Sequence, residues 1–216
     1  MKTKHISYGF LLLIIASFLI SCSASNHPDE RNAVKQLFEA FRNYSSEDME
    51  KLISLKDGDV YFWSFSDEQF EAYSYLCEQI PSSTMFLRSV ALKIKYSILS
   101  ITETGNGCDI ALRVKFKDCS SFAKDVFNTY KTYILTSKLD EIELLDREKA
   151  FDGIVVRFIA EDSYEYVSKD ITLSLSRDSS GKLLFADNPA FAEIATGGLL
   201  SNPGTLTETI NNQNSD

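Results

Sequence analysis

Histidine is almost absent from this chain. The 216 residues contain two histidines, His5 and His27, and both precede residue 30. The rest of the protein therefore lacks the side chain that most often serves as a general base and as a zinc ligand. This absence excludes a Ser-His-Asp triad, a Cys-His pair and a histidine-based zinc site from the body of the protein. Any catalysis there would have to use carboxylates, tyrosine or lysine.

Cysteine is also scarce, and no CxxC motif occurs, so neither a thiol-disulfide exchange site nor a zinc ribbon is indicated. Beyond Cys22, the body contains Cys77, Cys108 and Cys119. The last two flank an alternating segment that, as one strand, would hold them about 36 Å apart. A disulfide needs Cα atoms about 4.4–6.8 Å apart. Any bridge must therefore use Cys77, and the favoured alternative is three buried thiols without a bridge.

Basic residues are outnumbered, with 22 Lys and Arg against 31 Asp and Glu and a net charge of −9. Nucleic-acid binding draws mainly on Lys and Arg, so no nucleic-acid partner is expected. The acidic stretches lack the alternating loop spacing of a calcium site, and we predict neither a metal nor a cofactor. Glycine and proline are few, with 9 and 4 residues, whereas 15 Phe and 10 Tyr predict a well packed body.

The first 21 residues contain the one long apolar run. Lys2 and Lys4 precede about 15 mostly apolar residues between Ile6 and Ile20. A bilayer-spanning helix needs about 20. A basic start, a short apolar run and small residues are the layout of a secretory signal peptide.

The end of that run, Leu19-Ile20-Ser21-Cys22, resembles the lipobox of bacterial lipoproteins. The resemblance implies cleavage after residue 21 and a lipid on Cys22, which anchors the protein on the extracytoplasmic face of the cell membrane. Two or more acyl chains hold a protein firmly there. The alternative is an ordinary cleaved signal peptide with an incidental cysteine. Cleavage would remove two lysines and no acid, leaving 195 residues with a net charge of −11.

The rest of the chain divides into three parts. We predict a tether over 22–29, one folded domain over 30–198 and a polar, disordered tail over 199–216. Apolar residues at steps of three and four predict helices. They are expected over 30–44, after Ser45 or Ser46, around 70–77, near 85–92, over 122–134, across 144–158, and from Pro189 to Gly197.

Two stretches have the period of two that indicates strands. Alternating residues flank Gly105-Asn106-Gly107, which predicts a hairpin of Ile94–Thr104 with Cys108–Lys117. A second hairpin is predicted around the Asp-Ser-Ser-Gly turn at 178–181. Hairpins form antiparallel sheets and blocks of helices cover one sheet face, so the fold class is α+β.

This pattern resembles the cystatin-like and NTF2-like domains of many bacterial lipoproteins. The similarity lies in the amphipathic opening at 30–53, the strand that leads into a helix at 108–127, and the hairpin with its following helix at 168–198. Leu183-Leu184-Phe185 stands where that pattern usually has a tryptophan. The resemblance implies a curved antiparallel sheet packed against N-terminal and inserted helices.

Members of the NTF2-like group include both isomerases or dehydratases and non-catalytic modules, and fold alone does not choose between them. We expect a non-catalytic module that binds an unknown protein or small-molecule ligand. The alternative is a small-molecule enzyme that uses a carboxylate and a tyrosine in a cavity, for which Tyr61, Tyr96 and Asp109 are the nominees. The predicted pocket or partner surface comprises Tyr61, Trp63, Phe65, Tyr96, Arg113 and Lys115. The favoured alternative for the aromatic residues among them is packing, at the end of the sheet or in the core.

Side-chain alternation assigns the two faces of the first hairpin. Ile110, Leu112, Val114 and Phe116 share the face that the helices should bury. Arg113, Lys115 and Lys117 project from the other face, which should be solvated or line a groove. A concave basic face would favour an anionic ligand, and an apolar one a partner or a neutral ligand.

Truncation distinguishes the two faces. Leu112→Ala should lower the free energy of unfolding by about 2–5 kcal/mol through lost burial and a cavity, and Lys115→Ala by less than about 0.5 kcal/mol. Denaturant melts of both variants measure the difference. Equal losses, or the reverse order, would contradict this assignment of the faces.

Overall fold

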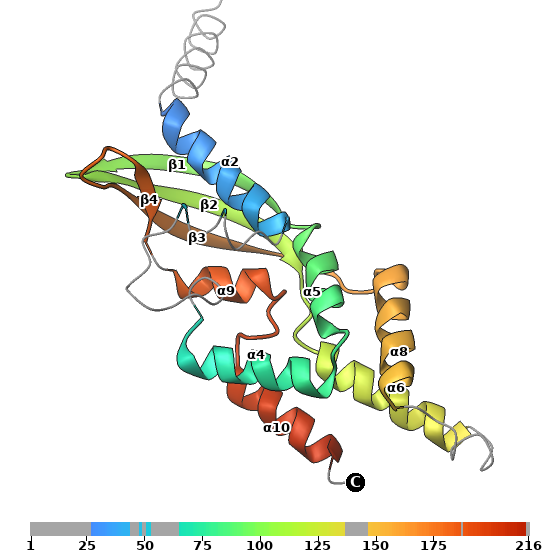
Figure 1. Ribbon diagram of the computed structural model, residues 1–216. Coiled ribbons are helices and arrows are strands. Elements are labelled where there is room, and N and C mark those ends of the chain that lie inside the picture. The colour runs from blue at the N-terminus through green and yellow to red at the C-terminus, as the bar shows by residue number, and fades with distance from the viewer. Residues whose placement is uncertain are drawn as a thin grey trace, which may run out of the picture.

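The computed structural model describes residues 27–43, 48, 51–52, 65–136, 147–186 and 188–214. Within them the chain is α+β, with an open four-stranded antiparallel sheet (Figure 1). The helices are α2 (Pro28–Arg42), α4 (Asp67–Gln79), α5 (Ser83–Ala91), α6 (Phe122–Thr136), α8 (Arg147–Glu161), α9 (Pro189–Ala195) and α10 (Pro203–Asn214). The strands are β1 (Lys95–Thr104), β2 (Gly107–Lys117), β3 (Tyr166–Arg177) and β4 (Leu183–Phe185).

The sheet is a meander in the order β1-β2-β3-β4, so both predicted hairpins are confirmed. In the first, Thr104 pairs with Gly107 beside the turn and Lys95 pairs with Lys115 at the far end. The register of β1 shifts between Ile98 and Ser100, which leaves Leu99 as a bulge in an edge strand.

One face of the sheet carries the first core. Helices α2 and α9 cover it, and their aromatic side chains meet those of the strands. Phe38 stacks on Tyr96 with ring centroids 4.1 Å apart, and Phe191 meets the Phe38 and Phe41 rings edge-on. Ile110, Leu112, Val114 and Phe116 are all buried on this face, as alternation predicts.

A second core lies beyond the end of the sheet. Helices α4, α5, α6, α8 and α10 surround it, and its centre is the Phe86–Phe122 stack, with centroids 3.9 Å apart. We expected the inserted helices to cover the sheet. Instead α6 and α8 bury their apolar faces in the second core. There they pack with the apolar side chains of α5, which lies at the end of the sheet. Through Ala91 the same helix also reaches the first core.

The expectation of a disordered tail over 199–216 is wrong for most of that range. Helix α10 packs beside α4, and Leu199, Leu200, Leu206 and Ile210 are buried in the second core. The helix has a start signal, since the Asn202 side chain accepts a hydrogen bond from the Thr205 N–H at 3.2 Å and proline follows it. The sequence pattern did not predict this helix, because its few apolar residues are separated by threonines and asparagines.

Other sequence predictions differ in their bounds or cannot be compared. Helix α2 begins at Pro28, inside the tether predicted over 22–29. The signal segment 1–21, Cys22 and most of the helix predicted after Ser45 or Ser46 lie outside the described residues. Cys77, Cys108 and Cys119 are free thiols, and Cys108 and Cys119 are buried as expected, but Cys77 is only half-buried.

Two glycines close α9 where the two cores meet. Gly198 N–H bonds to the Glu193 carbonyl and Gly197 N–H to that of Ile194, which is the Schellman pattern. Gly197 has φ +61°, and a Cβ there would lie 2.7 Å from the Lys117 carbonyl oxygen. Its own carbonyl accepts a 2.6 Å hydrogen bond from the Cys119 N–H. The chain leaving β2 therefore passes so close to this turn that only glycine fits.

Alanine should have opposite effects at two glycines. Gly197→Ala should lower the free energy of unfolding by about 2–4 kcal/mol, from left-handed backbone strain and the clash with Lys117. Gly153→Ala should raise it by about 0.5–1 kcal/mol, because Gly153 lies on the exposed side of α8 with open space around its Cα. Urea melts of the two variants test the pair, and a mild effect at Gly197 would refute the close-approach argument.

Candidate functional site

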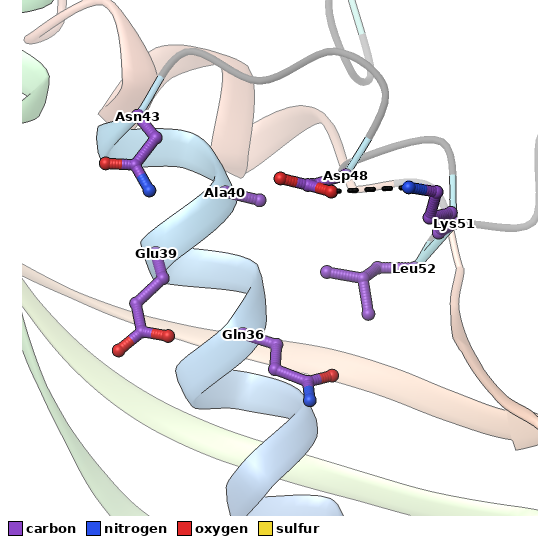
Figure 2. Close-up of a pocket in the computed structure, with 7 residues that line it drawn as sticks. All are labelled: Gln36, Glu39, Ala40, Asn43, Asp48, Lys51 and Leu52. Carbon is purple, nitrogen blue, oxygen red and sulfur yellow. Dashed lines mark hydrogen bonds and ion pairs between the residues drawn. The ribbon is translucent and has the colours of Figure 1, made fainter.

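A shallow groove of about 280 Å³ runs beside the C-terminal half of α2 (Figure 2). Gln36, Glu39 and Ala40 of α2 and Asn43 just after it line one side, and Asp48, Lys51 and Leu52 line the other. Lys51 and Asp48 form an exposed ion pair at 3.5 Å. The groove offers amides and single charges for hydrogen bonding, but these residues show no acid-base pair poised for proton transfer.

The second candidate surface is the sheet face opposite α2 and α9. None of the described helices packs on it, and most of its side chains are exposed. Along β3 its residues are Tyr166, Ser168, Asp170, Thr172, Ser174 and Ser176. Hydroxyls dominate its centre, where the Ser174 hydroxyl donates to the Asp109 carboxylate at 2.7 Å. We call this surface the open face.

Lysines gather around one aromatic ring at the end of the open face that is remote from the β1–β2 turn. Lys95, Lys115 and Lys117 place their ammonium groups 5.8, 4.9 and 4.2 Å from the centroid of the Tyr166 ring. Lys95 and Lys115 are directly opposed on neighbouring strands. Among the described residues, neither of these two has a carboxylate partner. We call these four residues the lysine–tyrosine cluster.

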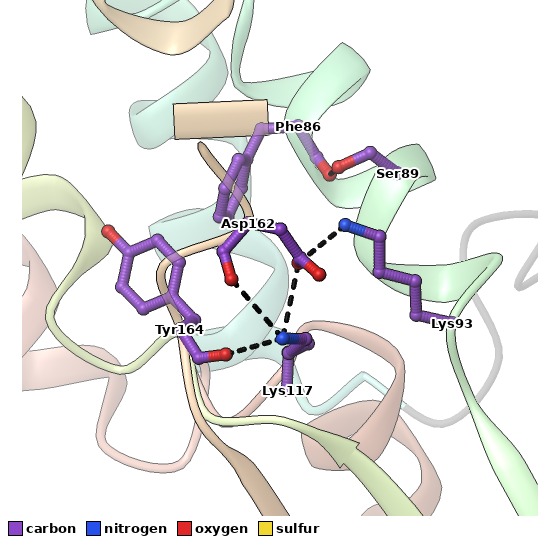
Figure 3. Close-up of polar contacts among 6 residues, drawn as sticks. All are labelled: Phe86, Ser89, Lys93, Lys117, Asp162 and Tyr164. Atoms are coloured by element: carbon purple, nitrogen blue, oxygen red, sulfur yellow. Dashed lines mark hydrogen bonds and ion pairs between the residues drawn. The ribbon is translucent and has the colours of Figure 1, made fainter. Parts of the chain in front are cut away.

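Lys117 has a different environment, shown in Figure 3. Alternation predicted it to be solvated, but it is only 6% exposed because the connection from α8 to β3 folds over it. Its ammonium donates to the Tyr164 carbonyl at 2.6 Å and the Asp162 carbonyl at 3.3 Å, and lies 3.2 Å from the Asp162 carboxylate. The adjoining hollow has a volume of about 10 Å³, which is room for one water at most.

Asp162 links Lys117 to a second lysine. It follows the last residue of α8 with φ +49°, a left-handed conformation that aspartate tolerates better than most residues. Its carboxylate accepts a 2.6 Å hydrogen bond from Lys93. The hydrogen bonds from Lys93 and then Lys117 lower the pKa of Asp162, although partial burial opposes them.

A buried tyrosine lies beside this network. The Tyr164 hydroxyl donates to the Asp125 carboxylate of α6 at 3.0 Å. Burial, and then the Asp125 charge, raise the pKa of Tyr164. Tyr164 therefore stays a neutral donor that ties the α8–β3 connection to α6, and it is unsuited to act as a base.

Of the predicted site residues, the structure brings Arg113 and Lys115 together on the open face. Arg113 is already engaged, since its guanidinium forms two 2.8 Å hydrogen bonds with the Asp170 carboxylate. The hydrogen bond from Arg113 lowers the pKa of Asp170. Lys115 is thus available to a ligand, whereas Arg113 would first have to leave Asp170.

The other predicted residues lie elsewhere. Tyr96 faces the first core, where burial raises its pKa. Phe65 packs against the second core, with its ring 5.7 Å from that of Tyr73. Tyr61 and Trp63 lie outside the described residues. The predicted set therefore does not form one surface.

Sequence reasoning missed Lys95, Tyr166 and the cluster they form. A signal was present, because the alternation in β3 can be followed back from Asp170 through Ser168 to Tyr166. The missing information was the three-strand register that opposes Lys95 to Lys115 and Lys117 to Tyr166.

The described residues contain no group of three or more His, Cys, Asp or Glu side chains arranged to hold a metal ion. None of their helices combines the length and apolarity needed to cross a membrane.

Comparison of the chain with protein-family models, with curated proteins and with solved structures gave no match. What the site can bind is therefore inferred from the residues of this chain alone.

Asp162→Asn tests the network, because asparagine keeps the shape and tolerates the left-handed backbone. It should lower the free energy of unfolding by about 1–2 kcal/mol at pH 7, less than for a fully buried pair because Asp162 is half exposed. A lowered carboxylate pKa contributes stability above its ordinary value of 3.8, and that contribution is lost as pH falls through the lowered pKa.

Urea melts at pH 7 and near pH 3 should therefore show a gap between wild type and variant that narrows in acid. Asp170→Asn is the matched control, since its exposed pair with Arg113 should matter less. A gap of the same size at both pH values would mean that the Asp162 charge does not stabilise Lys117.

Proposed function

We propose that the protein is a bacterial lipoprotein, held on the extracytoplasmic face of the cell membrane by lipid on Cys22, whose domain is a non-catalytic binding module. We further propose a cystatin-like or NTF2-like fold for it, because α2 lies across an antiparallel meander (Figure 1). No cofactor is part of the proposal.

The anchor is supported by the lipobox-like residues Leu19-Ile20-Ser21-Cys22 and by the short apolar run before them. The position of α2 defines how such an anchor would hold the domain. Arg177, beside the β1–β2 turn, lies 3.3 Å from Glu30 and 3.9 Å from Asp29 in the first turn of α2. Five residues from Cys22 to His27 span at most about 18 Å. The turn end of the sheet would therefore be the end near the membrane.

Binding is favoured over catalysis by the positions of the nominated tyrosine and carboxylate. Tyr96 pairs with Val114 and faces the first core, whereas Asp109 lies on the open face, five residues along β2. That spacing corresponds to about 17 Å. A general base and an oxyanion donor must both reach one substrate, and these two residues do not. Between α2 and the sheet, the rings of Phe38, Tyr96 and Phe191 fill the space where a catalytic cavity would lie.

The observation that carries the proposal is the open face itself. One face of the sheet carries the first core under α2 and α9, while the other presents a broad polar surface with two lysines that have no carboxylate partner among the described residues. Such a surface offers hydrogen bonds and charge to a partner without enclosing a substrate.

Cys22→Ser tests the anchor, because the thiol is the only atom to which the lipid can be attached. We expect the variant to leave the membrane fraction, whereas wild type stays there after a high-salt wash. Cys77→Ser is the control and should be retained like wild type. Retention of Cys22→Ser after the wash would defeat the lipoprotein proposal.

A further inference from the structure

We propose that the lysine–tyrosine cluster is a docking site for an acidic segment of a partner protein. This inference deepens the proposed function and rests on the domain being a binding module. It adds the place of contact and the chemistry of the partner.

The cluster is arranged at a cost that a bound anion would offset. Like charges directly opposite on neighbouring strands destabilise a sheet, and Lys95 and Lys115 are so placed. Lys117 and Lys93 add two more positive charges nearby, and among the described residues their carboxylate partner is Asp162. The chain has a net charge of −9, yet four lysines gather at this end of the sheet. Asp118 and Asp162 lie near Lys117 and Lys93, whereas Lys95 and Lys115 have no carboxylate partner among the described residues. An anion between Lys95 and Lys115 would relieve their repulsion.

The shape of the site favours a protein segment over a small anion. Small-molecule sites are concave and enclose most of the ligand. Here Lys95 and Lys115 are exposed, and the adjoining hollow of about 10 Å³ is lined by Lys93 and Lys117, whose charges Asp162 already occupies. An acidic segment lying on the open face could pair its carboxylates with the two lysines. Its backbone could bond to the hydroxyls of Ser168, in the same row of the sheet, and Ser97, in the next row.

The cluster is also poorly placed to bind the protein's own membrane. Lys115 is eight residues along β2 from Gly107, or about 26 Å from the end that the anchor would hold. That near end is acidic, and its carboxylates are Asp29, Glu30, Glu103 and Asp178. An anionic bilayer lying along the sheet would meet these first. The cluster instead faces away from the anchor, toward partners.

The experiment is a fluorescence-anisotropy titration of the purified full-length chain in neutral detergent with a labelled ten-residue peptide of glutamates and glycines. The test variant is Lys95→Gln with Lys115→Gln. The matched control is Lys124→Gln with Lys182→Gln, which removes the same charge from exposed lysines outside the cluster. Thermal melts check folding, and Lys95→Gln alone should keep or raise Tm because it relieves the repulsion with Lys115.

We expect wild type and control to bind the peptide alike and the test variant to bind about five- to tenfold more weakly, since each exposed ion pair contributes up to about fivefold. The difference should shrink at high salt. Tyr166→Leu, which removes the ring beneath the lysines, should also weaken binding. Equal weakening in the test and control variants would overturn the proposal, because it would show only the effect of net charge. Failure of the wild-type protein to bind the peptide would also overturn it.

Two further arms separate the partner classes. Inorganic phosphate at millimolar concentration should displace the peptide no better than sulfate does. Selective displacement by phosphate would contradict the proposal and identify the ligand of the cluster as a phosphate group. Sedimentation with anionic and neutral phospholipid vesicles should not depend on the two lysines. Lysine-dependent binding to the anionic vesicles, with no peptide binding, would assign the cluster to lipid instead. The peptide titration needs no lipid on Cys22, so failure of the anchor and failure of this site give different results.

Discussion

The buried ammonium group of Lys117 is the constraint on which the arrangement of the two cores depends. A buried charge without partners would be strongly destabilising, so the end of β2 must stay where the Asp162 and Tyr164 oxygens can reach it. Those oxygens belong to the connection between α8 and β3. The same contacts therefore hold the helical core against the end of the sheet, and the close approach of Gly197 to the Lys117 carbonyl holds α9 there too.

Charged residues are unevenly distributed between the β1–β2 turn and the junction, which is the end of the sheet that contacts the second core. Carboxylates predominate near the β1–β2 turn, whereas Lys93, Lys95, Lys115 and Lys117 lie at the junction end. A net charge of −9 therefore describes the molecule poorly, because lysines without a carboxylate partner among the described residues gather at one end of the sheet. An approaching partner meets the local potential, which screening confines to about 8–10 Å in physiological salt.

Local patterns predicted much of the fold, and long-range register accounts for most of what they missed. Alternation around Gly105-Asn106-Gly107 was enough to assign the buried face of β2, because a strand has only two faces. Lys117 broke the pattern, since its burial comes from a connection some 45 residues away in sequence. Helix α10 was missed because only Leu206 and Ile210 mark its buried face, and its capping residue was not used. Of the candidate site, Lys115 was found, but Lys95 and Tyr166 depend on pairings across three strands.

The bulge at Leu99 would matter for copies of the protein held side by side on one membrane. Strand β1 is an edge, and an unpaired edge can recruit the same strand of a neighbouring copy. The register shift interrupts its row of free backbone groups, and a charged lysine stands at its start. A lipid anchor would confine copies to two dimensions, where encounters are frequent. The irregular edge would then keep crowded molecules from joining sheet to sheet, and would leave the open face accessible.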